Sequence, residues 1–206
     1  FYKIFCITDN KKYSEIAKYY GAECPILRPK NISLDKSPDI EWVNWFLNYL
    51  KINSIECDAF SILRPTSPVR NDVTIKKAIK LFLNSSNTDS LRAVEKCKQH
   101  PGKMWIYDNV FIKPLINKKI KKTPWHSSQY ANLPVIYEQN ASLEIAWTKT
   151  VKKYNTISGK KIIPFFTKNS QGYDINTIDD IDYLKYQIKK NKISITKIRK
   201  KSWFDK

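Results

Sequence analysis

The protein has 206 residues, of which 42% are hydrophobic and 13% aromatic, and its 37 Lys and Arg against 19 Asp and Glu give a net charge of +18. A chain of this length and composition can form one α/β domain with a sizeable core, which excludes an intrinsically disordered protein and a chain of two ordinary domains. No apolar run is long enough to cross a bilayer, so we expect no membrane partner and a cytoplasmic location.

The first half of the chain alternates between strand-like and helix-like segments. Apolar runs predict strands over 1–8, 22–27, 58–63 and 90–94, and helical spacing predicts helices over 13–20, 39–50 and 72–83. Gly21 is expected to end the first helix and Pro38 to stand in the first turn of the second. This alternation predicts an α/β fold with a mostly parallel, doubly wound sheet flanked by helices.

The pattern changes after residue 96. Two apolar runs on either side of Asp108 and Asn109 predict a β-hairpin. Further strands are expected over 135–137, 143–147 and 162–166, and a helix over 179–190. We expect the excursion at 100–147 to form an arm that covers a neighbouring subunit, within one domain over 1–206.

The run from Arg64 to Arg70 follows a buried strand and combines two prolines, two hydroxyls and two guanidiniums. Ligands bind at the carboxyl ends of strands in open α/β sheets, where such side chains suit phosphate or carboxylate oxygens. A second interpretation stays open, in which the run is a plain strand-to-helix loop and Ser67 or Asn71 caps the next helix.

The positive charge and the cysteines point to no further class of site. The charge is mostly lysine spread along the chain and no nucleic-acid-binding motif accompanies it, so we do not expect a nucleic-acid partner, although steep salt-dependent DNA binding would favour one. Four cysteines, expected to be buried thiols in a reducing compartment, lie far apart without metal-ligand spacing: Cys6, Cys24, Cys57 and Cys97.

Several blocks, taken in order, resemble the acylneuraminate (CMP-sialic acid) cytidylyltransferase family over nearly the whole chain. The run at 63–70, LRPTSPVR, is similar to the family's LQPTSPLR block. The other matching blocks are CITD at 6–9, EIAKYYGAE at 15–23, LRP at 27–29, HPGK at 100–103, LP at 133–134, QN at 139–140 and DINT at 174–177.

The resemblance implies a Rossmann-like nucleotidyltransferase that joins CTP to an acidic sugar such as a nonulosonic acid, releases pyrophosphate, depends on Mg²⁺ and forms a homodimer. It implies catalytic roles for Asp174 and Arg64, and metal binding by Asp174 and Asn176. The substrate-binding residues it implies are Arg28, Asp39, Thr66, Ser67, Lys103 and Asn140. His100 is expected to be structural.

Each of these residues also has a plainer interpretation. Asp174 could cap a turn or helix, as Asp179 or Asp180 could, and Asn140 could be a turn residue. Arg28 could be a surface arginine at a strand end, and Lys103 a solvated lysine. The resemblance favours the ligand role for Asp174 and leaves Lys103 open.

The chain also departs from the family pattern. The family's first strand and its phosphate-binding loop are expected upstream of Phe1, so we expect this fragment alone to be weak or inactive. Arg64 stands where many members have Gln, Glu144 where they have Tyr, and Asn176 where a second carboxylate is usual, which should lower Mg²⁺ affinity. The alternative function is therefore a non-catalytic or degenerate relative that acts as a sugar-nucleotide-binding or structural subunit.

Overall fold

The computed structural model describes residues 2–168, 170–196, 198 and 200–205. Its α-helices are α1 (Lys11–Tyr19), α2 (Asp39–Ile52), α3 (Asp72–Asn84), α4 (Thr148–Tyr154) and α5 (Ile178–Lys189). Its strands are β1 (Ala59–Ile62), β2 (Ser90–Lys96), β3 (Trp105–Asp108), β4 (Phe111–Pro114), β5 (Lys119–Ile120), β6 (Thr123–Pro124), β7 (Tyr137–Trp147) and β8 (Ile162–Phe166).

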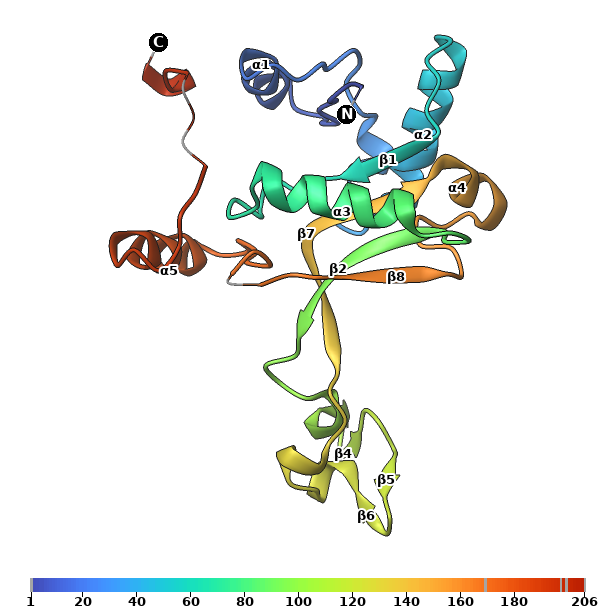
Figure 1. Ribbon diagram of the computed structural model, residues 1–206, viewed down its shortest axis with the longest axis vertical. Coiled ribbons are helices and arrows are strands. Elements are labelled where there is room, and N and C mark those ends of the chain that lie inside the picture. The colour runs from blue at the N-terminus through green and yellow to red at the C-terminus, as the bar shows by residue number, and fades with distance from the viewer. Residues whose placement is uncertain (1, 169, 197, 199, 206) are drawn as a thin grey trace.

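Four of these strands form the central sheet, in the order β1-β7-β2-β8. β7 is antiparallel to both of its neighbours, and β8 is parallel to β2. Hence β1, β2 and β8 share one direction and β7 alone runs against it (Figure 1). The α/β prediction is confirmed, with a mixed sheet whose strands mostly run one way.

Helices cover both faces of this sheet. Ala78 and Phe82 of α3 pack on one face against a buried cluster made of Leu91, Ala93, Leu143 and Ile145. α2 and α4 cover the other face, where Val43, Ile62 and Val151 are buried together. Successive strand residues point to opposite faces of a sheet. Arg92 and Glu144 alternate along their strands with the residues that face α3, so their side chains lie on the opposite face, which α2 and α4 cover.

The helix boundaries follow local capping signals. The side chain of Asn10 accepts hydrogen bonds at the start of α1, and Gly21 follows its end with φ +97°. The side chain of Asn71 accepts from the backbone N–H of Thr74 at 2.8 Å. This contact settles which residue caps α3, since Ser67 is instead almost fully buried.

Among the described residues, which exclude Phe1, two of the expected strands are absent. The segments 1–8 and 22–27 share a single parallel bridge between Phe5 and Glu23, and the backbone N–H of Cys6 donates to the carbonyl of Glu23 at 2.8 Å. Pro25 follows almost at once, and proline has no N–H to continue a ladder. The prediction of strands there is therefore wrong.

The region after the arm also differs from expectation. Residues 135 and 136 lie outside any strand, and 137–147 form one strand, whose pairing with β2 shifts in register between Arg92 and Val94. Helix α4 was not expected, because its sequence is mostly Thr and Lys. The burial of Val151 and Thr150 shows that packing against the sheet stabilises it.

The predicted hairpin is confirmed as β3 and β4, which project with β5 and β6 away from the central sheet (Figure 1). The later part of the range 100–147 belongs to the central sheet through β7. His100 is buried at the base of the projection, where its ring contacts the carbonyl of Pro134 at 3.0 Å and the N–H of Gly102 at 2.9 Å.

All four cysteines are free thiols, and only Cys24 is fully buried, so the expectation that all four are buried is wrong for the other three. Among the helices of the described residues, none combines the length and the apolar character that a membrane crossing requires.

Candidate active site

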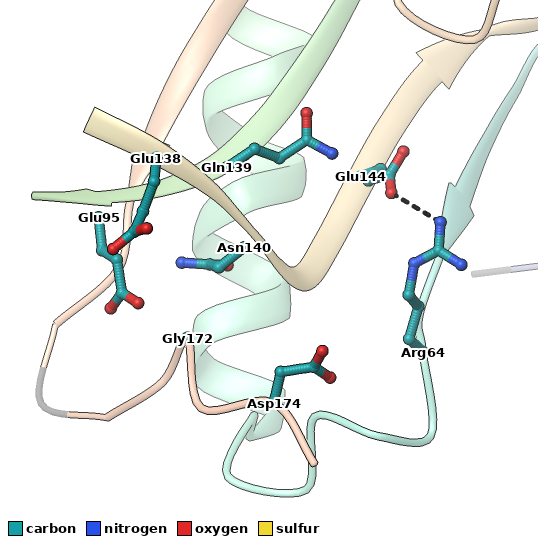
Figure 2. Close-up of a pocket in the computed structure, with 8 residues that line it drawn as sticks. All are labelled: Arg64, Glu95, Glu138, Gln139, Asn140, Glu144, Gly172 and Asp174. Carbon is teal, nitrogen blue, oxygen red and sulfur yellow. Dashed lines mark hydrogen bonds and ion pairs between the residues drawn. The ribbon is translucent and has the colours of Figure 1, made fainter. Parts of the chain in front are cut away.

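A cavity of about 370 Å³ opens at the end of the central sheet where β1 stops and β7 bends. Figure 2 shows its lining, which comes from four separate stretches of the chain. The residues are Arg64, Glu95, Glu138, Gln139, Asn140, Glu144, Gly172 and Asp174. Arg64, Asn140 and Asp174 were predicted as site residues, and the fold brings these three together.

Arg64 lies just after β1 and is held from two sides. Its Nη2 atom is paired with Asp39, at the start of α2, and lies 3.2 Å from Oε1 of Glu144. Arg70 stabilises the loop that follows β1, because its guanidinium donates to the backbone carbonyl of Arg64 at 3.0 Å and to that of Ser142 in β7. Partial burial alone would raise the pKa of Asp39, but the hydrogen bonds from Arg64 and Trp42 and the charge of Arg64 lower it.

Asp174 reaches the cavity because the segment before α5 packs onto the loop after β1. Val69 from that loop is buried with Leu184 and Ile193, and the N–H of Ile175 donates to the carbonyl of Thr66 at 2.9 Å. The helix cap is provided by Thr177 and Asp180, which form a capping box. Asp174 therefore has no capping role.

The carboxylate of Asp174 has one satisfied and one free oxygen. Oδ2 accepts from the side-chain amide of Asn176 at 3.1 Å. Oδ1 is buried, and within the described residues it has no hydrogen-bond partner. A buried carboxylate oxygen without a partner is costly unless a ligand satisfies it.

Asn140 lies inside β7 and is buried, so the turn interpretation is wrong. Its Nδ2 donates to Oγ1 of Thr167 at 2.8 Å, and its Oδ1 accepts from the N–H of Ser142 at 3.2 Å. Both contacts fix the amide beside the cavity, next to Gly172 (Figure 2).

Two lining carboxylates were not found from the sequence. Glu95 and Glu138 stand directly opposite each other on β2 and β7, and no ion pair joins either of them to another described residue. Like charges at such positions are unfavourable. No motif pointed to them, because their proximity follows only from the strand register. With Glu144 and Asp174 they make the cavity wall rich in carboxylates.

The other predicted substrate-binding residues lie outside this lining. Asp39 pairs with Arg64, and its role in substrate binding stays a prediction. Arg28 donates from Nε to Oγ of Ser33 at 2.8 Å. Thr66 is exposed and contributes its backbone carbonyl, and Ser67 is buried without a partner for its hydroxyl among the described residues. Lys103 lies in the arm, where Nζ donates to the carbonyls of His126 at 2.9 Å and Ser128 at 2.6 Å. Roles for these four in substrate binding remain predictions.

The donor set fits a magnesium ion held by one protein carboxylate. Mg²⁺ is commonly bound through one or two carboxylates together with substrate phosphates and water. The buried Oδ1 of Asp174 has no partner among the described residues, and its chemistry suits such a ligand. Asn176 is exposed, and its side-chain amide donates to Oδ2 of Asp174, which holds that carboxylate in place. Metal binding by Asn176 stays a prediction.

Gly172 provides a first test of the cavity wall. A Cβ atom at this position would lie 2.4 Å from Nδ2 of Asn140 and 2.9 Å from Oε2 of Glu95. We expect Gly172→Ala to push Asn140 out of place and to lower the free energy of unfolding by about 1–3 kcal/mol. Urea denaturation measures the change, with the exposed Lys168→Ala in the same loop as control. An unchanged midpoint of urea denaturation in Gly172→Ala would show that the cavity wall accommodates the added methyl group without loss of stability.

No family model matches the chain. It is 34% identical over 82 residues to an N-acylneuraminate cytidylyltransferase of Escherichia coli O18:K1:H7, a match that covers 40% of this chain and 18% of the relative. It is 26% identical over 178 residues to the CMP-N,N'-diacetyllegionaminic acid synthase of Legionella pneumophila, covering 85% of this chain and 73% of the relative.

The fold is that of a solved nucleotidyltransferase. The structure of a CMP:2-keto-3-deoxy-manno-octonic acid synthetase complexed with CTP superposes with a TM-score of 0.58 over 92% of this chain and 81% of that chain, at 7% sequence identity. The chain thus spans less than a fifth of the first relative and about three quarters or more of the other two proteins.

Proposed function

Because the chain is a relative of the acylneuraminate cytidylyltransferases, we propose that it activates an acidic sugar of the nonulosonic type with CTP. The sugar's anomeric hydroxyl oxygen bonds to the α-phosphorus of CTP and its proton passes to water, while the bond from that phosphorus to the oxygen that bridges it to the β-phosphorus breaks and pyrophosphate leaves. One observation carries the proposal: Arg64, Asn140 and Asp174, each from a block that resembles the family, line one cavity.

The side chains suit this reaction because phosphoryl transfer depends mainly on positioning and on neutralising charge. The guanidinium of Arg64 is suited to bind the sugar carboxylate, and the fixed amide of Asn140 is suited to orient a sugar hydroxyl. Asp174 would hold Mg²⁺, which would offset the phosphate charges. Three carboxylates in the lining, Glu95, Glu138 and Asp174, have no ion pair among the described residues, and they support a cation requirement because they would otherwise repel a triphosphate.

The proposed function is tested with protein expressed from its complete reading frame. Pyrophosphate release is followed with CTP, Mg²⁺ and each of three acids: N-acetylneuraminic acid, N,N'-diacetyllegionaminic acid and 3-deoxy-D-manno-octulosonic acid. We expect release with at least one nonulosonic acid and none without sugar. The absence of release with every acid, combined with retained binding of a CMP-sugar, would favour the non-catalytic alternative that the neutral Asn176 suggests. The cytoplasmic location stays a prediction.

The arm supports a homodimer. The hairpin of β3, β4 and the turn between them is exposed although it carries large apolar side chains: Tyr107 of β3 is 69% exposed, Val110 in the turn 74% and Phe111 of β4 73%. Exposed apolar strips of this kind mark interaction surfaces. We propose that a second copy of the chain covers the hairpin.

The dimer is checked by light scattering after size exclusion. Phe111→Asp is expected to shift the protein from dimer to monomer, because a buried, unpaired carboxylate at an interface is strongly unfavourable. Val73→Asp, which places the same charge at a 52% exposed position on α3, should leave the dimer intact. A monomeric wild type, or a dimer that persists in Phe111→Asp, would assign another role to the hairpin.

A further inference from the structure

A chain of alternating charges runs along one wall of the candidate active site. Asp39 pairs with Arg64, Arg64 with Glu144, and Glu144 with Arg92. Glu144 is 5% exposed and has an arginine at each carboxylate oxygen, since Oε1 faces Arg64 and Oε2 faces Arg92. Arg92 also donates to Oγ of Ser158 at 2.6 Å.

The strand register explains why Glu144 occupies the centre of this chain. On the two sides of β7, Glu144 stands opposite Ile62 of β1 and Arg92 of β2. Side chains of cross-strand partners point to the same face of a sheet. Arg64 follows Ile62 by two residues, and side chains two positions apart in an extended segment point to the same face of the sheet. The side chain of Arg64 therefore lies on the face of Glu144. Glu144 is thus the carboxylate between the two guanidiniums.

The pairing uses only part of the hydrogen-bonding capacity of Arg64. Both of its acceptors, Asp39 and Glu144, are contacted through Nη2. Within the described residues, Nε and Nη1 contact no acceptor. A guanidinium has five N–H donors in a planar arrangement that matches a carboxylate. Arg64 therefore retains donors for a further anionic group in the cavity that it lines.

We propose that Glu144 is a positioning residue that holds the guanidinium of Arg64 in the cavity wall, with its free donors available to the carboxylate of the acidic sugar. The inference rests on the function proposed above and extends it, because it gives a role to a residue that touches no reacting atom. Glu144 also separates two positive charges that would otherwise repel. Burial lowers the pKa of Arg92, the positive charge of Arg64 lowers it further, and the charge of Asp39 acts in the opposite direction.

The positions of the four charges predict in which direction the KM for the sugar acid changes when Glu144 loses its charge. Without the Glu144 charge, Arg64 is repelled by Arg92 and retains only Asp39, so it moves toward α2 and away from the cavity. If Glu144 merely weakened the positive charge of Arg64, its removal would instead strengthen the binding of an anion. The two possibilities predict opposite changes in the KM for the sugar acid.

The test compares the steady-state kinetics of the wild type and Glu144→Gln with the best acid from the panel above. We expect the KM for the acid to rise roughly tenfold, the size of a typical coupling between contacting residues, with a KM for CTP that changes by less than about twofold. Glu56→Gln, an exposed carboxylate before β1, is the matched control. In an Arg64→Gln background, Glu144→Gln should have almost no further effect on the acid KM.

Glu144→Gln leaves Arg92 without its buried partner, so folding is followed by circular dichroism. If the single variant unfolds, the double variant Arg92→Met, Glu144→Gln removes both buried charges and is compared with Arg92→Met, Glu144→Asp. A lowered or unchanged acid KM in a folded, active variant would overturn the inference alone. A wild type that neither binds nor converts any of the acids would overturn the proposed function and the inference together.

Discussion

Asp174→Asn is expected to reduce kcat/KM for pyrophosphate release by about a thousandfold, because it removes the charge that would hold the metal without changing the shape of the side chain. Asp174 is the cavity carboxylate whose buried Oδ1 has no partner among the described residues. Its Oδ2 contact with Asn176 can be retained by the amide oxygen of the variant. The loss should therefore appear in catalysis and much less in stability.

Metal binding gives a second readout for this prediction. Mn²⁺ titrated in the presence of CTP and followed by electron paramagnetic resonance should bind the wild type and bind Asp174→Asn much more weakly. Asp179→Asn removes an exposed carboxylate in the first turn of α5 and should leave kcat/KM within about twofold, since exposed charges in such positions contribute little. Wild-type kcat/KM in Asp174→Asn would refute both its catalytic role and its role as metal ligand.

Arg92→Ala is expected to lower the free energy of unfolding by about 3–5 kcal/mol, because it leaves Glu144 buried with a charge that is only partly compensated. Arg92 is 7% exposed and contacts both Glu144 and Ser158. Domains of this size have total stabilities of about 5–15 kcal/mol, so the change is large. Urea denaturation, with the midpoint and the m-value fitted separately, measures it.

The same chain offers a matched contrast. Lys76 forms an ion pair with Asp72 at 3.0 Å across one turn of α3, and both side chains are at least 70% exposed. Lys76→Ala should leave the free energy of unfolding almost unchanged, because solvent screens such a pair. The double variant Arg92→Met, Glu144→Leu, which replaces both buried charges by apolar groups, should recover most of the stability lost in Arg92→Ala. Equal losses in Lys76→Ala and Arg92→Ala would contradict the argument from burial.

Local sequence signals were sufficient where neighbouring residues decide the conformation. Asn71 before α3, Gly21 after α1 and the Asp108-Asn109 turn between β3 and β4 all act within a few residues, and the elements they bound were predicted. The structure places Asn109 at φ +54°, a conformation that asparagine tolerates better than most residues.

The predictions failed where distant contacts decide. The 148–154 segment has no apolar periodicity of its own, and it is helical because Val151 and Thr150 are buried against the sheet. Residues 22–27 resemble a strand, yet Pro25 has no N–H, so their ladder with residues 4–8 stops after the bridge at Glu23 and only the N–H of Arg28, which donates to the carbonyl of Thr8 at 2.9 Å, contacts that segment again. The sequence pattern of a segment indicates which secondary structures it can form, and the segments packed against it in the fold decide which of these it adopts.

The amino-acid sequence by itself determined the α/β class, the main helices and the chemistry offered by Arg64, Asn140 and Asp174, because these depend on residue type, spacing and resemblance. Only the tertiary structure decided that Glu144 lies between Arg64 and Arg92 and that Glu95 faces Glu138. The reason is that strand order and register are set by pairing between segments far apart in the chain. Inserting β7 between β1 and β2 brings together charges that no local pattern relates.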